Sequence, residues 1–261
     1  MTALIILPGL DGLGLMHDDF IAALGPGYDV KAVLYPNQPG LSYNELEILA
    51  SAALPESGPF ILLGESFSGP LAIRLAAANP ERTLGLILCV SFVRNPYPVL
   101  AWLRPLIRIL PVAGAPVALV TRLVLGKAVS AGLRQSLAEL LARISPDALR
   151  ARLRAVLAID VSTEFAALKL PVPYLRGKYD RIVPRRASEL AARLNPRMRI
   201  AEFPSSHLLL QTAPREAAQA VVQFVHEIAH PPVSETTAPC HDPAPIPATP
   251  VRPGHSTCVG G

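Results

Sequence analysis

The feature that most restricts the fold is a regular alternation of short apolar runs with segments of helical periodicity. Six runs are typical of buried or half-buried strands: residues 3–7, 28–35, 60–63, 84–90, 173–176 and 199–203. Helical patterns follow several of them, as in residues 43–54 and 70–78. Strands that alternate with helices indicate right-handed βαβ units. We therefore predict an α/β fold with a mostly parallel central sheet flanked by helices.

The alternation stops between Phe92 and Leu170, where no strand is predicted. Leucine and isoleucine instead recur at helical spacing, at Leu100, Leu103, Leu106, Ile107 and Leu110 and again at Leu133, Leu137, Leu140, Leu141 and Ile144. Ser145 followed by Pro146 predicts a further helix start. Residues 93–170 are thus expected to form a helical insertion into a core made of residues 1–92 and 171–230. Residues 231–261 are Pro-rich and are predicted to be a disordered tail.

The composition excludes several functional classes. Of the 261 residues, 51% are hydrophobic and 17% charged, and the net charge is only +4 without a run of Lys or Arg, so nucleic-acid binding is not expected. The longest uncharged apolar stretch, residues 109–121, is short and broken by Pro111 and Pro116, so no integral membrane span is predicted.

The cysteines and the first residues bear on localisation. Cys89, Cys240 and Cys258 are too few and too scattered for a disulfide framework. The chain begins M-T-A-L-I-I-L-P-G, which has neither the basic nor the long apolar region of a signal peptide. Both observations favour a reducing compartment, and a cytoplasmic location is expected.

The candidate chemistry lies at a strand-to-helix corner. Residues 60–71 read F-I-L-L-G-E-S-F-S-G-P-L, in which Ser66 has the position of a nucleophile on a strained turn. Ser68 stands where a G-x-S-x-G motif has its second glycine. We expect position 68 to require only a small side chain, because the helix packs closely on the neighbouring strands. A corner without catalytic function is the alternative.

A serine hydroxyl needs a base within hydrogen-bond reach and a third group that orients that base. Asp180 follows the strand of residues 173–176, and His207 follows the strand of residues 199–203. Since the carboxyl ends of parallel strands share one edge of a sheet, Ser66, Asp180 and His207 are expected to meet there. They are the predicted catalytic residues, in the order Ser, acid, His.

Four motifs in this order resemble the α/β-hydrolase superfamily: L-P-G-L-D-G-L-G, G-E-S-F-S-G, G-K-Y-D-R-I-V-P and S-S-H-L-L-L-Q-T-A-P. The resemblance covers residues 3–229, although the antiparallel strands that usually open this fold are missing. It implies an oxyanion hole formed by the N–H groups of Leu10 and Phe67. It also implies that residues 93–170 are a cap whose Leu103, Leu106, Ile107 and Leu110 line an apolar substrate pocket. No cofactor and no metal are implied.

A narrower resemblance concerns a possible partner of the cap. The cap size and the segment P-Y-L-R-G-K-Y-D-R-I-V-P-R are similar to those of pimeloyl-carrier-protein methyl ester esterases, which dock an acidic carrier protein on a basic cap. Here Arg143, Arg150, Arg152 and Arg154 would form that basic side, and the partner would be an acyl carrier protein. The alternative is that these arginines are an ordinary solvated face.

Two other segments resemble metal sites. Residues 226–230 read H-E-I-A-H, a pattern that on a helix can hold zinc with Glu227 as base. However, the helix ends there and no third ligand is evident, since His241 and His255 belong to the tail. A zinc protease is therefore not predicted, whereas adventitious metal binding stays open. His17-Asp18-Asp19 is interpreted as a helix start with acidic residues in its first turn.

These observations predict a serine hydrolase that cleaves carboxylic esters of small molecules through an acyl-enzyme. Thioester hydrolysis and acyl transfer are alternatives on the same triad. A non-catalytic binding module of the same fold is the alternative from another class.

Overall fold

The computed structural model describes residues 2–109, 117–126 and 129–230. The predicted tail, residues 231–261, and the predicted pocket residue Leu110 lie outside the described residues. Within the described ranges, no helix has both the length and the apolar character needed to cross a membrane.

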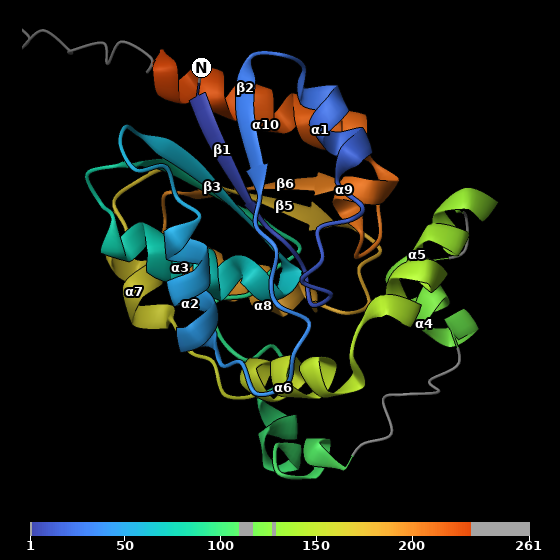
Figure 1. The fold of residues 1–261 in the computed structure, drawn as a ribbon. Helices are drawn as coiled ribbons and strands as arrows, with labels where there is room; N and C mark the ends of the chain where they lie inside the picture. Colours follow the sequence, from blue (N-terminus) through green and yellow to red (C-terminus); the bar gives the residue numbers. More distant parts are fainter. Residues whose placement is uncertain (1, 110–116, 127–128, 231–261) are drawn as a thin grey trace, which may run out of the picture. The chain divides into compact units, whose positions relative to one another are not determined.

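The centre of the fold is a six-stranded sheet in the order β2-β1-β3-β4-β5-β6 (Figure 1). All of its pairings are parallel, so the predicted α/β architecture is confirmed. The strands are β1 (Thr2–Leu7), β2 (Tyr28–Ala32), β3 (Phe60–Glu65), β4 (Thr83–Cys89), β5 (Val172–Gly177) and β6 (Met198–Phe203). Each lies where an apolar run predicts it. The strand order reverses beside β1, and this is where ligands bind in open parallel sheets.

Helices cover both faces of the sheet (Figure 1). One face carries α1 (Asp18–Leu24) and α10 (Pro214–Ala229), which the short α9 (Leu209–Thr212) precedes. The other face carries α2 (Tyr43–Ala52), α3 (Gly69–Ala78), α7 (Ser162–Ala167) and α8 (Arg185–Leu194). This arrangement follows from the right-handed crossovers between parallel strands.

Alternating strand residues divide the core between these two faces. In β1, Ile5 and Leu7 pack with α2 and α3, whereas Leu4 and Ile6 pack with α1 and α10. All the residues of β3 are buried, because this strand is central and covered on both faces. The continuous apolar runs of the sequence are therefore explained by two apolar layers, one on each side of the sheet.

The segment between β4 and β5 is mainly helical, as predicted. It contains the 3-10 helices η2 (Pro98–Leu103) and η3 (Leu106–Arg108), followed by α4 (Val117–Val124), α5 (Ala131–Arg143) and α6 (Pro146–Val156) before α7. Ser145 caps α6 and accepts a hydrogen bond from the Ala148 N–H at 3.5 Å, which confirms the predicted helix start.

The structure differs from the prediction near Leu103 and Leu106. Their helical spacing predicts an α-helix, but the segment forms two short 3-10 turns. Pro105 lies between these turns and lacks the N–H that a continuous helix would need.

Candidate active site

Three loops at the carboxyl edge of the sheet bring the predicted triad together. Ser66 directly follows β3, Asp180 lies three residues after β5, and His207 lies four residues after β6. The Ser66 Oγ is 2.8 Å from the His207 Nε2, and the His207 Nδ1 is 2.9 Å from the Asp180 Oδ2. All three side chains are buried. The geometry is that of a nucleophile, a base and an orienting carboxylate.

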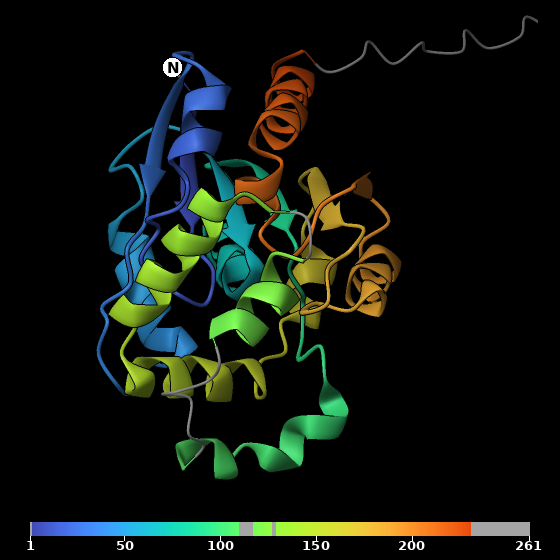
Figure 2. The same ribbon diagram turned by 90° about the vertical axis from the view of Figure 1, so that its right-hand side faces the viewer.

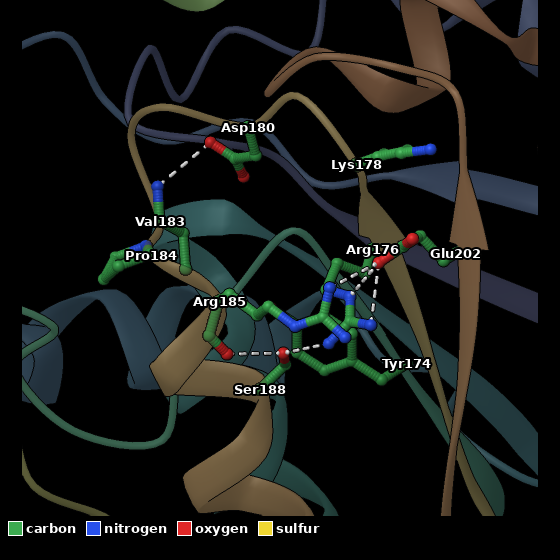
Figure 3. Close-up of a pocket in the computed structure, with 10 residues that line it drawn as sticks. Tyr174, Arg176, Lys178, Asp180, Val183, Pro184, Arg185, Ser188 and Glu202 are labelled. Atoms are coloured by element: carbon green, nitrogen blue, oxygen red, sulfur yellow. Dashed lines mark hydrogen bonds and ion pairs between the residues drawn. The ribbon is translucent and has the colours of Figure 1, made fainter.

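The carboxylate of Asp180 is fixed on both sides. Its Oδ1 accepts hydrogen bonds from the N–H groups of Ile182 and Val183, at 2.8 and 3.0 Å. This leaves the Oδ2 to accept the proton of the His207 Nδ1. The pair of Arg176 and Glu202, 2.7 Å apart, joins β5 to β6, and both residues line a small polar hollow that Asp180 also lines (Figure 3).

Ser66 has the strained backbone that a nucleophile elbow requires. Its φ is 48°, in the left-handed region that residues other than glycine rarely adopt. The Ser66 carbonyl accepts a hydrogen bond from the Ser91 hydroxyl at 2.5 Å, and Ser91 in turn leaves no room at Gly69 for a Cβ. The strain is thus held by close packing of β3, α3 and the loop after β4.

Ser68 does more than meet a size limit, which sequence analysis did not anticipate. Its hydroxyl donates to the carbonyl of Pro8. Because that carbonyl can only accept, the Tyr35 hydroxyl, 2.6 Å away, must donate to Ser68. The residue that replaces the expected glycine therefore ties the elbow to the loop after β1, which carries Leu10.

Arg152 of α6 holds the same loop from the cap side. Its guanidinium donates to the carbonyls of Leu10, Asp11 and Pro36 at 2.9, 2.5 and 3.1 Å. The side chain is only 1% exposed. The interpretation of Arg152 as part of a basic docking face or a solvated face is therefore wrong. Gly12 makes this contact possible, because a Cβ there would lie 2.6 Å from the guanidinium.

The other arginines of the predicted basic side differ from Arg152. Arg143 is exposed, Arg154 is half-buried, and Arg150 pairs with Asp147 at 2.6 Å. The four residues therefore do not form one continuous solvated surface.

A buried charged cluster lies beside Ser66. The Nε2 of His17 donates to Glu65, the residue before Ser66, at 2.8 Å, and Gln211 donates to the other carboxylate oxygen at 3.2 Å. Asp11 belongs to the same cluster: a Cβ built on Gly9 would lie within 4.0 Å of Asp11, Glu65 and Ser66. His17 is thus more than the helix start that sequence analysis assigned, although it does precede α1.

The cluster shifts the pKa values of its members. Burial opposes the charged forms of both Glu65 and His17, but their mutual attraction outweighs it. The pKa of Glu65 is consequently lowered and that of His17 raised, which favours the ion pair. Burial and the neighbouring Glu65 raise the pKa of Asp11.

The predicted pocket residues within the described ranges are half-buried or exposed. Leu103 and Ile107 are half-buried, Leu106 is exposed, and η3 packs against α6. The insertion contacts the loops of the predicted triad at the end of α4, whose Val124 carbonyl accepts from the His207 N–H at 3.2 Å, and at Tyr97, whose hydroxyl donates to the Ile182 carbonyl at 2.8 Å. Nearby, Leu125 clusters with Leu13 and Leu208. That Leu103, Leu106 and Ile107 line the substrate pocket stays a prediction.

The H-E-I-A-H segment lies at the end of α10. The rings of His226 and His230 stack 4.4 Å apart and are exposed, and Glu227 accepts from Gln223 at 3.0 Å. In the described part of the chain, no three His, Cys, Asp or Glu side chains are grouped so that they could hold a metal ion. His241 and His255 are outside it.

Comparison with known proteins agrees with the observed fold. The family model described as "Alpha/beta hydrolase family" matches residues 4–220. The chain belongs to the alpha/beta hydrolase family. A comparison with curated proteins finds no match.

Solved structures with this fold include enzymes of different descriptions. A thermophilic esterase from Thermogutta terrifontis aligns with a TM-score of 0.74 at 18% identity, over 87% of this chain and 90% of that one. An esterase from Exiguobacterium antarcticum aligns with a TM-score of 0.71 at 17% identity, over 87% and 92%. A bromoperoxidase from Bacillus anthracis aligns with a TM-score of 0.70 at 15% identity, over 86% and 92%. At these identities the likeness is one of fold, so the reaction must be argued from the site.

Proposed function

We propose that this alpha/beta hydrolase family member is a serine hydrolase that cleaves carboxylic esters. The observation that carries the proposal is the buried hydrogen-bonded chain from the Ser66 Oγ through His207 to Asp180. In this hydrogen-bonded series, the hydroxyl, the imidazole and the carboxylate each have the partner that their proposed role requires. The esterases among the structures of the same fold support the ester as substrate class.

The reaction would proceed in two halves. The Ser66 Oγ attacks the acyl carbon while its proton passes to the His207 Nε2, and Asp180 stabilises the imidazolium through the Nδ1 proton. When the tetrahedral intermediate collapses, the bond to the alcohol oxygen breaks and the imidazolium protonates that oxygen. Water then attacks the acyl-enzyme with His207 as base, the acid is released, and the proton returns to Ser66.

Two backbone amides would stabilise the negative oxygen of the intermediate. We assign them to Phe67, directly after the nucleophile, and to Leu10, in the loop that Ser68 and Arg152 hold. Removal of one such donor typically costs about 3–4 kcal/mol of transition-state stabilisation. A loop that is already fixed by Arg152 would need no reorganisation during the reaction.

A substrate panel tests the reaction class. Matched p-nitrophenyl esters and acyl thioesters of increasing chain length are compared by kcat/KM, with and without an alcohol acceptor. The proposal predicts the highest kcat/KM with esters and release of free acid. A clear preference for thioesters, or acyl transfer to the alcohol in place of hydrolysis, would replace the ester reaction with one of its alternatives.

A further inference from the structure

The 3-10 segment of residues 98–109 exposes large apolar side chains to solvent. Neither η2 nor η3 contains a buried residue among those whose burial is described. Val99, Trp102, Leu106 and Ile109 are all exposed, with Trp102 at 69% and Ile109 at 79%. We call these four residues the apolar row. Exposed apolar groups this close together usually mark an interaction site.

The geometry of the segment places these residues in two pairs. In a 3-10 helix, residues three apart lie above one another. The apolar row consists of two such pairs, Val99 with Trp102 and Leu106 with Ile109. Leu103, which follows the first pair, and Ile107, within the second, are half-buried, and η3 contacts α6. The segment is therefore partly covered by the protein, whereas the apolar row stays exposed.

The segment is also the outermost element on its side of the molecule. In both views it lies beyond α6, on the side of α6 that is turned away from the sheet (Figures 1 and 2). The apolar row is thus on a projecting edge, and the described contacts of η3 run inward to α6.

The stretch of sequence that contains the apolar row carries charge of one sign. From residue 82 to residue 138 the sequence contains no Asp or Glu, and every charged residue is Arg or Lys. Arg104, between the two pairs of the row, is exposed. A surface of this kind is complementary to a partner that is both apolar and negatively charged.

We propose that the apolar row inserts into the headgroup region of an anionic lipid bilayer, with Arg104 at the phosphate level. Tryptophan is enriched at such interfaces because its ring is apolar and its N–H is polar. Basic residues near the surface add attraction to anionic lipid. A projecting edge of four large side chains suits insertion, whereas an acidic protein would need a matching groove. The protein would then lie on the membrane without spanning it. This binding does not depend on the reaction at Ser66.

Trp102 provides a direct readout, because it is the only tryptophan of the chain. The full-length protein is titrated with vesicles of phosphatidylcholine alone or mixed equally with phosphatidylglycerol, and Trp102 emission and co-sedimentation are recorded. The proposal predicts a blue shift and co-sedimentation with the anionic vesicles, both weakened by salt. Brominated lipid should quench the emission.

Three variants locate the contact. The double variant Leu106→Ser with Ile109→Ser keeps Trp102 and should weaken binding to the anionic vesicles by about tenfold or more. Arg104→Glu should weaken it by about tenfold. The matched control is Ile48→Ser on α2, which removes a side chain that is 71% exposed but outside the apolar row, and it should bind like the wild type.

Other outcomes would overturn the proposal. The lipid contact is refuted if the anionic vesicles cause no blue shift at low salt, or if Leu106→Ser with Ile109→Ser binds them like the wild type. A blue shift that grows with protein concentration without lipid would show that a second copy covers the row. An equal shift with soluble polyglutamate would assign the surface to an acidic polymer or protein.

Discussion

Glu65 and His17 are charged residues that the triad does not require, yet they are buried beside it. Their ion pair, 2.8 Å long, lies next to Ser66 and the loop of Asp11. Removing one member of a buried ion pair leaves the other charge buried without a partner. This costs more free energy of unfolding than the intact pair contributes. The pair is therefore expected to contribute to stability in a way that depends on pH.

We predict that Glu65→Gln lowers the free energy of unfolding by about 3 kcal/mol near pH 6, and by less on either side. The lowered pKa of Glu65 means that its contribution is present above its ordinary value of 4.5 and is lost as the pH falls through the folded value. The raised pKa of His17 means that its contribution is present below 6.5 and is lost as the pH rises through the folded value.

Urea unfolding followed by circular dichroism at several pH values checks this prediction. The control is Glu56→Gln, which changes an exposed carboxylate and should give only a small difference in stability. A difference between the wild type and Glu65→Gln that is constant from acid to alkaline pH would show that the pair is not ionised in the folded protein.

At the scale of elements, α6 connects the insertion through Arg152 to the loops after β1 and β2. This side chain reaches three carbonyls in two loops that lie more than a hundred residues away in sequence. We interpret Arg152 as a positioning residue, because it binds the loop that carries Leu10 and is not itself proposed to touch the substrate.

Arg152→Met is therefore expected to lower kcat for ester hydrolysis by about tenfold to a hundredfold, with a smaller change in KM. The reason is that a displaced Leu10 amide loses stabilisation made only in the transition state. Arg152→Lys should recover part of the rate, since an ammonium group still donates to a carbonyl. Steady-state kinetics on folded protein are the measurement.

Arg143→Met on α5 is the control for this prediction, because it also removes an arginine of the insertion but one that is exposed. Its kcat should equal that of the wild type. If Arg152→Met lowers only the melting temperature and leaves kcat unchanged, Arg152 stabilises the fold and does not position the loop.

The elements of the core were well predicted, and the physical reason is local. Runs such as residues 60–63 are apolar because β3 is covered on both faces, so the pattern reflects burial directly. The 3-10 turns at η2 and η3 were not predicted. The spacing of Leu103 and Leu106 resembles that of an α-helix, and Pro105 alone does not indicate which tighter turn replaces it.

At the scale of the whole molecule, sequence predicts some of the contacts between distant segments but not others. Ser66, Asp180 and His207 were predicted to meet because each follows a strand, and parallel strands present their ends at one edge. No such rule pairs His17 with Glu65 or buries Arg152, since arginine is usually exposed. The one sequence signal for Glu65 is its place in G-E-S, where an acidic residue ends an apolar run and directly precedes Ser66.

The roles of the triad are tested most directly by fluorophosphonate labelling and ester hydrolysis with Ser66→Ala, measured with and without EDTA. We predict that the wild type is labelled at Ser66 and that its activity is unaffected by EDTA. Ser66→Ala should be folded, unlabelled and slower in kcat by roughly three or more orders of magnitude. Hydrolysis by Ser66→Ala at the wild-type rate, lost with EDTA and restored by zinc, would contradict it.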